Sequence, residues 1–484
     1  MTAKKSVRSA ILASSIGQYL VFSMAFISVV TYSRLLSPSE IGVFAIASSL
    51  AMLAREIQLL GTASYLIRQK HISKKDVQSG IGLTMLICWS LGAIFFIIAN
   101  PISSYYEIPG LSGVIKILSL SFLVAPFISV TSALLIRKFQ FQKILQVTIT
   151  ARIAEFSLGI TLVYLGYSFY AMAIGVVCGT FIEFSLLYRF RTQETSWRPR
   201  FTNILPIVKF GLLTSSTNLM RRFGTTAPDI IIGKLGTPTE VAIFSRGLGF
   251  LDFAKNAMCQ GLQPIALPFL AQKNRENGNI NEGYLTATVL MGAVVWPVLT
   301  VCGIASYPII VFVFGQQWAN VAPIAGILSV WAIFTSVHLF SPALLIASFN
   351  EKIQFFKQLI IFILTVTGIL LTYEYGLKAV ALSLVFNAFI DMILITLIIK
   401  LATKLPIIEF VKRIMGNVIL CFSCGFTTWL IGYKLNFLST EPIISLLCVG
   451  AVAVSVWVVT IVLLKHPLLD ELKKLLNSTK MDVK

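Results

Sequence analysis

Two basic residues lie within long apolar stretches of this sequence, at matching positions in two halves of the chain. Arg55 follows Pro38 by 17 residues, and Lys255 follows Pro238 by the same interval. A charged residue at the centre of a membrane helix raises the free energy of insertion by roughly 2.5–3.5 kcal/mol, so such residues are rare and usually functional. Guanidinium and ammonium groups can bind phosphate oxygens. We therefore expect Arg55 and Lys255 to be substrate-binding residues.

Further charges lie inside apolar stretches at comparable depth. Arg152 lies early in one stretch, and Arg221 and Arg222 lie midway along another. All three are candidate substrate-binding residues. Glu183 and Asp391 are candidates for coupling to an ion, because carboxylates within membrane spans often titrate during transport.

A structural role is the alternative for several of these charges. Residues three or seven positions apart lie on one face of a helix and can form an ion pair that serves packing alone. The pairs with such spacing are Asp252 with Lys255, Arg152 with Glu155, and Arg222 with Asp229.

The elements that position these residues must be membrane-spanning helices. The chain of 484 residues is 56% hydrophobic and 12% charged, with a mean hydropathy of +0.85, and its apolar runs reach the ~20 residues that cross a bilayer. The runs are continuous and do not alternate, which excludes a β-barrel. We expect an all-α polytopic protein with fourteen spans, at about 10–33, 40–61, 77–99, 113–136, 144–165, 168–190, 204–233, 239–270, 284–313, 320–348, 354–374, 377–400, 408–432 and 442–464.

The distribution of Lys and Arg between the loops predicts the orientation. With the N-terminus placed in the cytoplasm, 28 basic residues fall in cytoplasmic segments and four, at positions 34, 234, 378 and 434, fall outside. Cytoplasmic loops carry such an excess, so both termini are predicted inside. This pattern also explains the net charge of +19 without nucleic acid. The first apolar run is too long for a cleaved signal peptide, so it is expected to remain as a span.

The sequence repeats itself at an interval of about two hundred residues. SRLLSPSEIGVF at 33–44 returns as GKLGTPTEVAIF at 233–244, and ALLI at 133–136 returns at 343–346. Each hinge has helix-start chemistry, with Ser or Thr as N-cap, Pro next and Glu in the first turn. Convergence on that chemistry is the alternative explanation. We predict two six-helix repeats, 1–200 and 201–404, followed by two further spans, 405–464, and a cytoplasmic amphipathic tail, 465–484.

The tail has its own pattern. Leucines at 468, 469, 472, 475 and 476 share one face of a predicted helix and lysines flank that face, which is typical of a helix lying on the membrane surface. We expect it to lie on the cytoplasmic leaflet.

No constellation of residues indicates an enzyme, a metal site or a cofactor. Cys421 and Cys424 have redox spacing without a second pair, and His338 is the one histidine within a span, where we expect it to be buried and hydrogen-bonded. A phosphate-binding glycine loop and a large outer loop are missing from the sequence. Transport driven by an ion or substrate gradient is therefore expected.

Several stretches resemble Wzx-type polysaccharide transporters, most closely the colanic-acid exporter-like group of the multidrug/oligosaccharidyl-lipid/polysaccharide exporter superfamily. Among them are RLLSPSEIGVFAIASSL at 34–50, LLIRKFQFQKI at 134–144 and VFGQQWANVAPIAGIL at 313–328. The resemblance covers essentially the whole chain. It implies V-shaped lobes in the bacterial inner membrane that flip an undecaprenyl-pyrophosphate-linked oligosaccharide for O-antigen, capsule or exopolysaccharide synthesis. It also implies a polysaccharide polymerase and chain-length machinery as candidate partners.

The resemblance places pyrophosphate-binding cations on spans 2 and 8, the spans of Arg55 and Lys255. Related flippases also have a cation in span 1, where the repeat equivalents of Arg221 and Arg222 are here Val21 and Phe22, so that part of the site is absent or displaced. Two other functions stay open at this point. One is a cation-coupled antiporter of the same superfamily, and the other is a membrane glycosyltransferase or polymerase.

Overall fold

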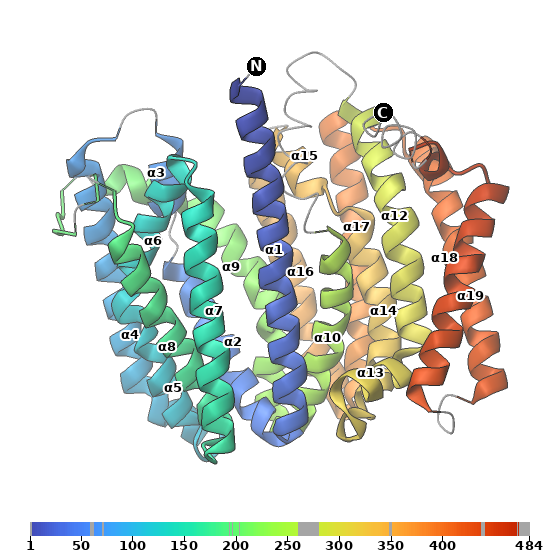
Figure 1. Ribbon diagram of the computed structural model, residues 1–484, viewed down its shortest axis with the longest axis horizontal. Helices are drawn as coiled ribbons and strands as arrows, with labels where there is room; N and C mark the ends of the chain where they lie inside the picture. Colours follow the sequence, from blue (N-terminus) through green and yellow to red (C-terminus); the bar gives the residue numbers. More distant parts are fainter. Residues whose placement is uncertain are drawn as a thin grey trace. The chain divides into compact units, whose positions relative to one another are not determined.

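The computed structural model describes residues 2–58, 62–69, 72–192, 194–195, 197–202, 204–259, 280–347, 351–436, 441–471 and 473. Every regular element in these ranges is a helix (Figure 1), which confirms the all-α prediction. The chain forms two compact units. The first contains Met1–Ser245 and Gln358–Val366, and the second contains Arg246–Lys357 and Thr367–Lys484. These units reflect packing, and the repeat boundary near residue 200 stays a prediction.

The first unit holds the N-terminal helices. They are α1 (Thr2–Leu35), α2 (Pro38–Gln58), α3 (Thr62–Arg68), α4 (Lys74–Tyr106), α5 (Leu111–Ser119), α6 (Ser121–Arg137), α7 (Phe141–Tyr164), α8 (Ser168–Arg189) and α9 (Leu205–Leu235). Within it, α7 packs along α8, α1 packs on α7, and α9 packs on α2. Its core includes Leu66, Ile81 and Leu134, which are fully or almost fully buried beside Phe127 and Trp197.

Most of the remaining helices belong to the second unit. They are α12 (Ile280–Ile304), α13 (Ser306–Phe314), η1 (Gln316–Trp318), α14 (Val321–Val337), α15 (Ser341–Ala347), η2 (Tyr373–Tyr375), α17 (Leu377–Thr403), α18 (Ile407–Leu435) and α19 (Pro442–Leu463). Two helices are shared between the units, α10 (Pro238–Cys259) and α16 (Glu351–Thr372). In the second unit α12 packs against both α14 and α18, and α18 packs against α19.

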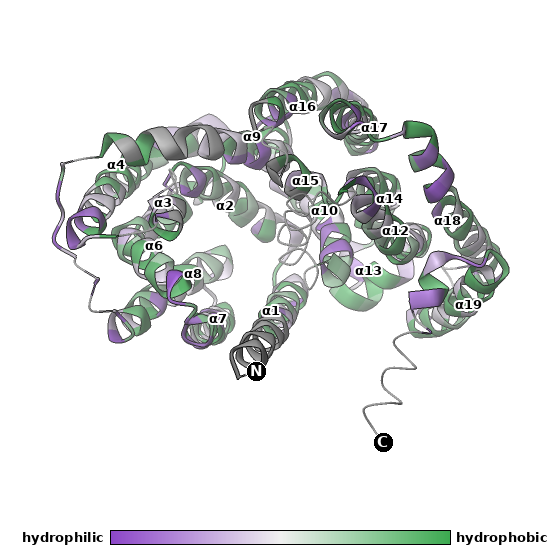
Figure 2. Ribbon diagram, turned by 90° about the horizontal axis from the view of Figure 1, so that it is seen from above, coloured by the Kyte–Doolittle hydropathy of each residue, from purple (hydrophilic) through white to green (hydrophobic). Residues whose placement is uncertain are grey.

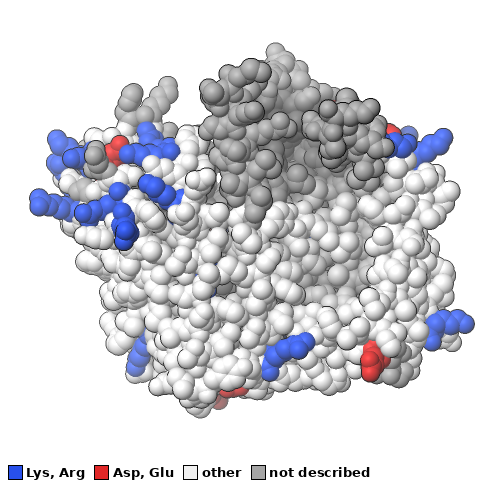
Figure 3. Space-filling view, in the orientation of Figure 1, with Lys and Arg blue, Asp and Glu red and all other residues white. Residues whose placement is uncertain are grey.

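Nine helical segments in the described ranges are long and apolar enough to cross a membrane. Figure 2, a view onto the ends of the helices, shows hydrophobic residues on the helices of both units. On the face of the first unit seen in Figure 3, Lys and Arg gather over α3 and α6 at one end of the bundle, and an uncharged band lies below them. The protein is therefore a multi-pass membrane protein. The count of fourteen spans and the orientation stay predictions.

Three predicted spans are divided in the structure. The span at 113–136 separates into α5 and α6 at Leu120, where the hydroxyls of Ser119 and Ser121 donate to the carbonyls of Lys116 and Leu118 at 2.6 and 2.7 Å. Such local hydrogen bonds compete with the helix ladder. The span at 284–313 divides at Ala305, because Pro308 has no N–H for the carbonyl four residues earlier. The span at 320–348 divides into α14 and α15.

Both copies of the duplicated hinge form the predicted helix start. In α2 the Ser37 N–H donates to Glu40 Oε2 at 2.8 Å, and the Glu40 N–H donates back to the Ser37 hydroxyl at 3.4 Å. In α10 the Thr237 N–H donates to Glu240 Oε2 at 2.8 Å, and the Glu240 N–H donates to the Thr237 hydroxyl at 3.3 Å. Each pair satisfies two backbone donors that a helix start otherwise leaves free. The predicted cap chemistry is confirmed at both positions.

The second hinge packs directly against the helix that follows the first. A Cβ atom at Gly42 of α2 would lie 1.8 Å from the Pro238 carbonyl oxygen, and one at Gly233 of α9 would lie 2.8 Å from the Ile46 side chain. Side chains larger than hydrogen therefore do not fit at Gly42 without movement of the backbone. This close approach sets the register between α2 and the α9–α10 hinge.

The tail is described only in its first part, so its position on the cytoplasmic leaflet stays a prediction. Residues 467–471 are helical, but Leu468 and Leu469 pack against a cluster formed by Ala293, Leu420 and Ile461. These two leucines thus contact the protein core, because the chain turns back after α19. The other leucines of the predicted face, at 472, 475 and 476, lie outside the described residues.

Candidate functional site

Two polar contacts join α2 to α9, one above the other. The Ser49 hydroxyl donates to Asp229 Oδ2 at 2.7 Å, and Arg222 binds Glu56. Ser49 and Glu56 are seven residues apart on α2, and Arg222 and Asp229 are seven residues apart on α9. Seven residues make about two helical turns, or about 10.5 Å of rise. The two helices therefore run antiparallel with a polar seam between them. This register agrees with the close approach of Gly42 to the second hinge.

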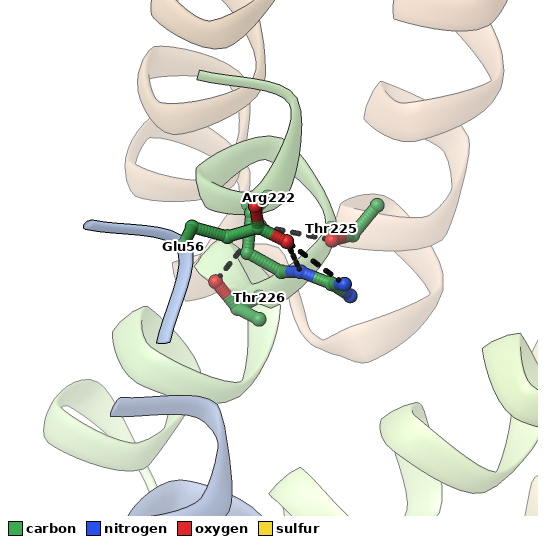
Figure 4. Close-up of polar contacts among 4 residues, drawn as sticks. All are labelled: Glu56, Arg222, Thr225 and Thr226. Atoms are coloured by element: carbon green, nitrogen blue, oxygen red, sulfur yellow. Dashed lines mark hydrogen bonds and ion pairs between the residues drawn. The ribbon is translucent and has the colours of Figure 1, made fainter. Parts of the chain in front are cut away.

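The Arg222 guanidinium donates two hydrogen bonds to one oxygen of Glu56, as Figure 4 shows. Its Nε and Nη2 atoms each lie 3.2 Å from Glu56 Oε1, and the hydroxyls of Thr225 and Thr226 donate to the Arg222 carbonyl. The Glu56 side chain is 11% exposed and that of Arg222 is 39% exposed. The predicted pairing of Arg222 with Asp229 is thus replaced by a pairing across helices. A partner on a neighbouring helix can lie at the same depth, whereas Asp229 is two turns away on the same helix.

The first unit also gathers charges from three helices around Arg55. Arg55 of α2 interacts electrostatically with Arg152 and Glu155 of α7 and with Glu183 of α8. Within this group Arg152 Nη1 contacts Glu155 Oε2 at 2.7 Å, so the predicted ion pair is present. The cluster, which we call the Arg55 cluster, contains two guanidinium groups and two carboxylates.

Small residues bring α8 close enough to place these charges together. A Cβ atom at Gly179 would lie 2.8 Å from the Glu155 Cβ, and one at Gly175 would lie 2.8 Å from the Glu155 carbonyl oxygen. The two glycines let α8 lie tightly against α7 beside Glu155. Glu183, one turn further along α8, then lies near both arginines. The packing of α7 on α8 therefore assembles the Arg55 cluster.

Arg55 differs from Arg152, Arg222 and Lys255 in having no fixed partner among the described residues. It forms neither a hydrogen bond nor an ion pair with any residue in the described ranges, and its side chain is exposed. Arg152 and Arg222 are each held by one carboxylate. Arg221 is exposed and likewise unbonded to described residues. A guanidinium that is exposed and unpaired keeps all five of its N–H donors available to an anion.

Lys255 lies in the second unit with contacts of its own. Its Nζ atom is 2.7 Å from Asp252 Oδ1, which is the predicted i,i+3 ion pair, and 5.2 Å from the centre of the Trp331 ring. Only 15% of the lysine side chain is exposed. Arg55 and Lys255 belong to different units, and each is described within its own unit.

The remaining polar candidates are bonded within the second unit. Asp391 accepts from Lys357 at 2.8 Å, and both side chains are mostly buried. His338 is buried as predicted, with Nδ1 2.6 Å from the Tyr284 hydroxyl and Nε2 2.8 Å from the Thr396 hydroxyl. Lys357 was not predicted as the partner of Asp391, because the two residues lie 34 positions apart in the chain. Lys357 lies two turns inside α16.

No metal-binding group emerges from the described part of the chain. The described residues contain no set of three His, Cys, Asp or Glu side chains that could hold a metal ion. Cys424 is buried, and its Sγ atom lies 3.9 Å from the Ala453 carbonyl of α19. This contact is that of a small residue packed between helices.

Comparisons with known protein sequences indicate the family of this chain. The model of the family described as polysaccharide biosynthesis protein matches residues 32–323. The succinoglycan biosynthesis transport protein ExoT of Rhizobium meliloti is 20% identical over 64% of this chain and 62% of its own length. The lipopolysaccharide biosynthesis protein WzxC of Escherichia coli is 23% identical over 71% of this chain and 70% of its own. The match thus spans less than two thirds of ExoT.

A solved structure shares the fold. The lipid II flippase MurJ, in an inward closed conformation, superposes with a TM-score of 0.77 at 15% identity, covering 95% of this chain and all of that one. At this identity the likeness establishes the arrangement of helices and leaves the substrate to be argued from the residues.

Proposed function

Because this chain belongs to the polysaccharide biosynthesis protein family, we propose that it is a flippase for lipid-linked oligosaccharides. It would carry an undecaprenyl-pyrophosphate-linked repeat unit across the bacterial inner membrane by alternating access, with both termini in the cytoplasm. A polysaccharide polymerase and chain-length machinery would act on the product. The names of its relatives and the MurJ-like fold support the class of substrate.

The observation that carries the proposal is the unpaired guanidinium of Arg55 beside Arg152. A pyrophosphate presents oxygens on two adjacent phosphorus atoms, and guanidinium groups bind such oxygens through paired N–H donors. Arg55 has all its donors available, and Arg152 uses Nη1 alone on Glu155. We propose that Arg55 makes the first contact with the pyrophosphate and that Arg152 adds a second.

The carboxylates of the Arg55 cluster would keep it neutral before substrate enters. Glu155 and Glu183 balance the two arginines, so the empty site does not hold an uncompensated charge in the membrane. Glu183 interacts with both arginines without a hydrogen bond to either in the described residues. It is therefore our proposed ion-coupling residue. Asp391 is a weaker candidate, since it is held by Lys357.

The other cations would have distinct tasks. Lys255 is proposed as a second substrate contact that becomes available when it leaves Asp252. Arg221, exposed on α9, is proposed to meet the substrate, while Arg222 is proposed to contribute through the half of its guanidinium that faces away from Glu56. The prenyl tail would stay in the lipid throughout, since a charged head group alone needs a polar path.

Export of surface polysaccharide in a bacterial strain lacking its own flippase tests the proposal. Arg55→Gln should abolish export at an unchanged membrane level of protein, and Arg55→Lys should restore part of it because a point charge replaces the planar fork. Lys400→Gln, a change at an exposed cation at the end of α17, serves as the matched control. Parental export by the Arg55→Gln, Lys255→Gln double variant would refute the assignment.

The two carboxylates of the cluster also support a second candidate, an ion-coupled antiporter for organic cations. Such a protein would use Glu155 and Glu183 to bind its substrate. It would confer resistance to cationic drugs and would leave polysaccharide export unrestored. These two outcomes separate the candidates in one strain.

A further inference from the structure

The second unit contains a cavity of about 570 Å³ that the proposed transport path does not use. It lies between the first turns of α12, the first turns of α18 and the end of α19. Val289, Ile419 and Leu464 form an apolar wall, and Glu282, Lys412 and Arg413 supply charge. The cavity therefore combines a hydrocarbon-lined part with a charged rim.

Most of the charge at the rim is already satisfied. The Arg413 guanidinium contacts both oxygens of Glu282, at 2.7 and 2.9 Å, and Glu409 Oε1 at 2.7 Å. Lys412 is exposed and forms no ion pair or hydrogen bond with any described residue. It is the cation of the rim that forms no ion pair with a described carboxylate. An occupant should therefore bring a negative charge to Lys412.

The floor of the cavity is fixed by hydrogen bonds. His466 Nε2 donates to Asn417 Oδ1 at 2.9 Å, and its Nδ1 accepts from the Leu468 N–H at 3.2 Å. Because Nδ1 is an acceptor, the imidazole is neutral and adds no charge. The packing of Leu468 and Leu469 on the core holds the same segment in place. The cavity is thus a formed feature of the unit.

Its position suits an amphiphilic molecule. The cavity is open at the ends of three membrane-length helices, where the apolar interior meets the head-group region. Basic pockets between membrane helices at this depth bind the head groups of anionic lipids. An acyl chain would cover the wall of Val289, Ile419 and Leu464, while a phosphate would meet the Lys412 ammonium.

We propose that this cavity is a binding site for an anionic glycerophospholipid, with the lipid phosphate on Lys412. The site goes beyond the proposed transport function and stands if that function fails, since it requires only that the protein lies in a membrane. A bound lipid would join α12, α18 and the start of the tail and so stabilise the second unit.

Thermal unfolding of the purified, delipidated full-length protein in a non-ionic detergent tests the site. Phosphatidylglycerol, phosphatidylcholine with the same chains, and inorganic phosphate are titrated separately. We expect phosphatidylglycerol to raise the unfolding midpoint at a concentration at least about tenfold lower than phosphatidylcholine, and inorganic phosphate to have no effect. Equal action of the two lipids, or action of inorganic phosphate alone, would overturn the proposal.

Three variants test whether the preference for phosphatidylglycerol over phosphatidylcholine arises from binding in the cavity. Lys412→Gln should remove the preference for phosphatidylglycerol, and Lys400→Gln should retain it. Met415→Trp, which places an indole in the cavity, should weaken stabilisation by both lipids. A retained preference in Lys412→Gln would refute the site. Stronger stabilisation by a polyprenyl phosphate than by phosphatidylglycerol would assign the cavity to the transported substrate instead.

Discussion

The helices α2 and α10 begin alike and differ towards their other ends. Both start with the same reciprocal bonds between a hydroxyl residue and a glutamate. Seventeen residues after the shared proline, however, Arg55 has no bonded partner in the described residues, whereas Lys255 is held by Asp252 and Trp331. The duplicated start serves folding in both copies. This difference at the other end is the reason why we propose Arg55, ahead of Lys255, as the leading anion-binding residue.

We expect the largest effect from a substitution at the contact between α2 and the second hinge. Gly42→Leu would drive a side chain into the Pro238 carbonyl, because even a Cβ atom lies 1.8 Å from that oxygen. Overpacking costs about 1–3 kcal/mol where side chains can yield, and a backbone oxygen yields less. The amount of folded protein in the membrane should fall severely.

Gly249 on α10 provides the control for that change. Nothing lies within 4 Å of a Cβ added there, so Gly249→Leu should be tolerated. The two variants are compared by fluorescence-detected size-exclusion chromatography. Equal levels of folded protein would show that the hinge contact is not tight.

The polar seam between α2 and α9 gives the next largest effect. Glu56→Gln removes the partner of Arg222 and should lower the free energy of unfolding by about 1–3 kcal/mol, since one charge of a partly buried pair is left alone. Adding Arg222→Gln should recover part of the loss. Thermal unfolding in detergent measures both steps. An additive loss in the double variant would mean that the two side chains do not interact.

The two caps should respond equally if the duplicated hinges are structural equivalents. Ser37→Ala and Thr237→Ala each remove one cap, which is worth about 0.5–2 kcal/mol. The shifts in the unfolding midpoint should agree with one another, and export per molecule should stay unchanged. A loss of export in only one of the variants would give that hinge a function beyond folding.

A smaller effect is expected on the pH dependence of stability, through His466 after α19. Burial lowers the pKa of His466 below its ordinary value, so the folded protein resists protonation that the unfolded chain accepts near pH 6.5. Stability from this group is therefore present above pH ~6.5 and lost as pH falls towards the folded pKa. His466→Gln should flatten this part of the stability profile between pH 7 and 5. An identical profile would show that His466 does not contribute.

The parts of the molecule that the sequence predicted are those decided by local chemistry. The caps at Ser37 and Thr237 and the ion pairs Arg152–Glu155 and Asp252–Lys255 involve residues within one or two turns. Their geometry follows from helix spacing alone. The same holds for the apolar helices, whose length is set by the bilayer.

The rest depended on which helices become neighbours. Glu56 and Arg222 are 166 positions apart, and no periodicity relates them. The division at Leu120 arises from two serine hydroxyls that turn back on the chain. The cavity beside Lys412 requires α12, α18 and the segment after α19 together. These features come from packing, which a single sequence does not specify residue by residue.

The affinity of the purified protein for a polyprenyl-pyrophosphate-linked sugar tests the central claim most directly. Arg55→Gln should weaken binding by at least about tenfold, because a hydrogen-bonded charge contributes about 1.5–3 kcal/mol. Lys255→Gln should weaken it less, and the further change Asp252→Asn should recover part of the loss. Parental affinity in Arg55→Gln, together with a large loss in Lys255→Gln that Asp252→Asn does not relieve, would contradict the leading role of Arg55.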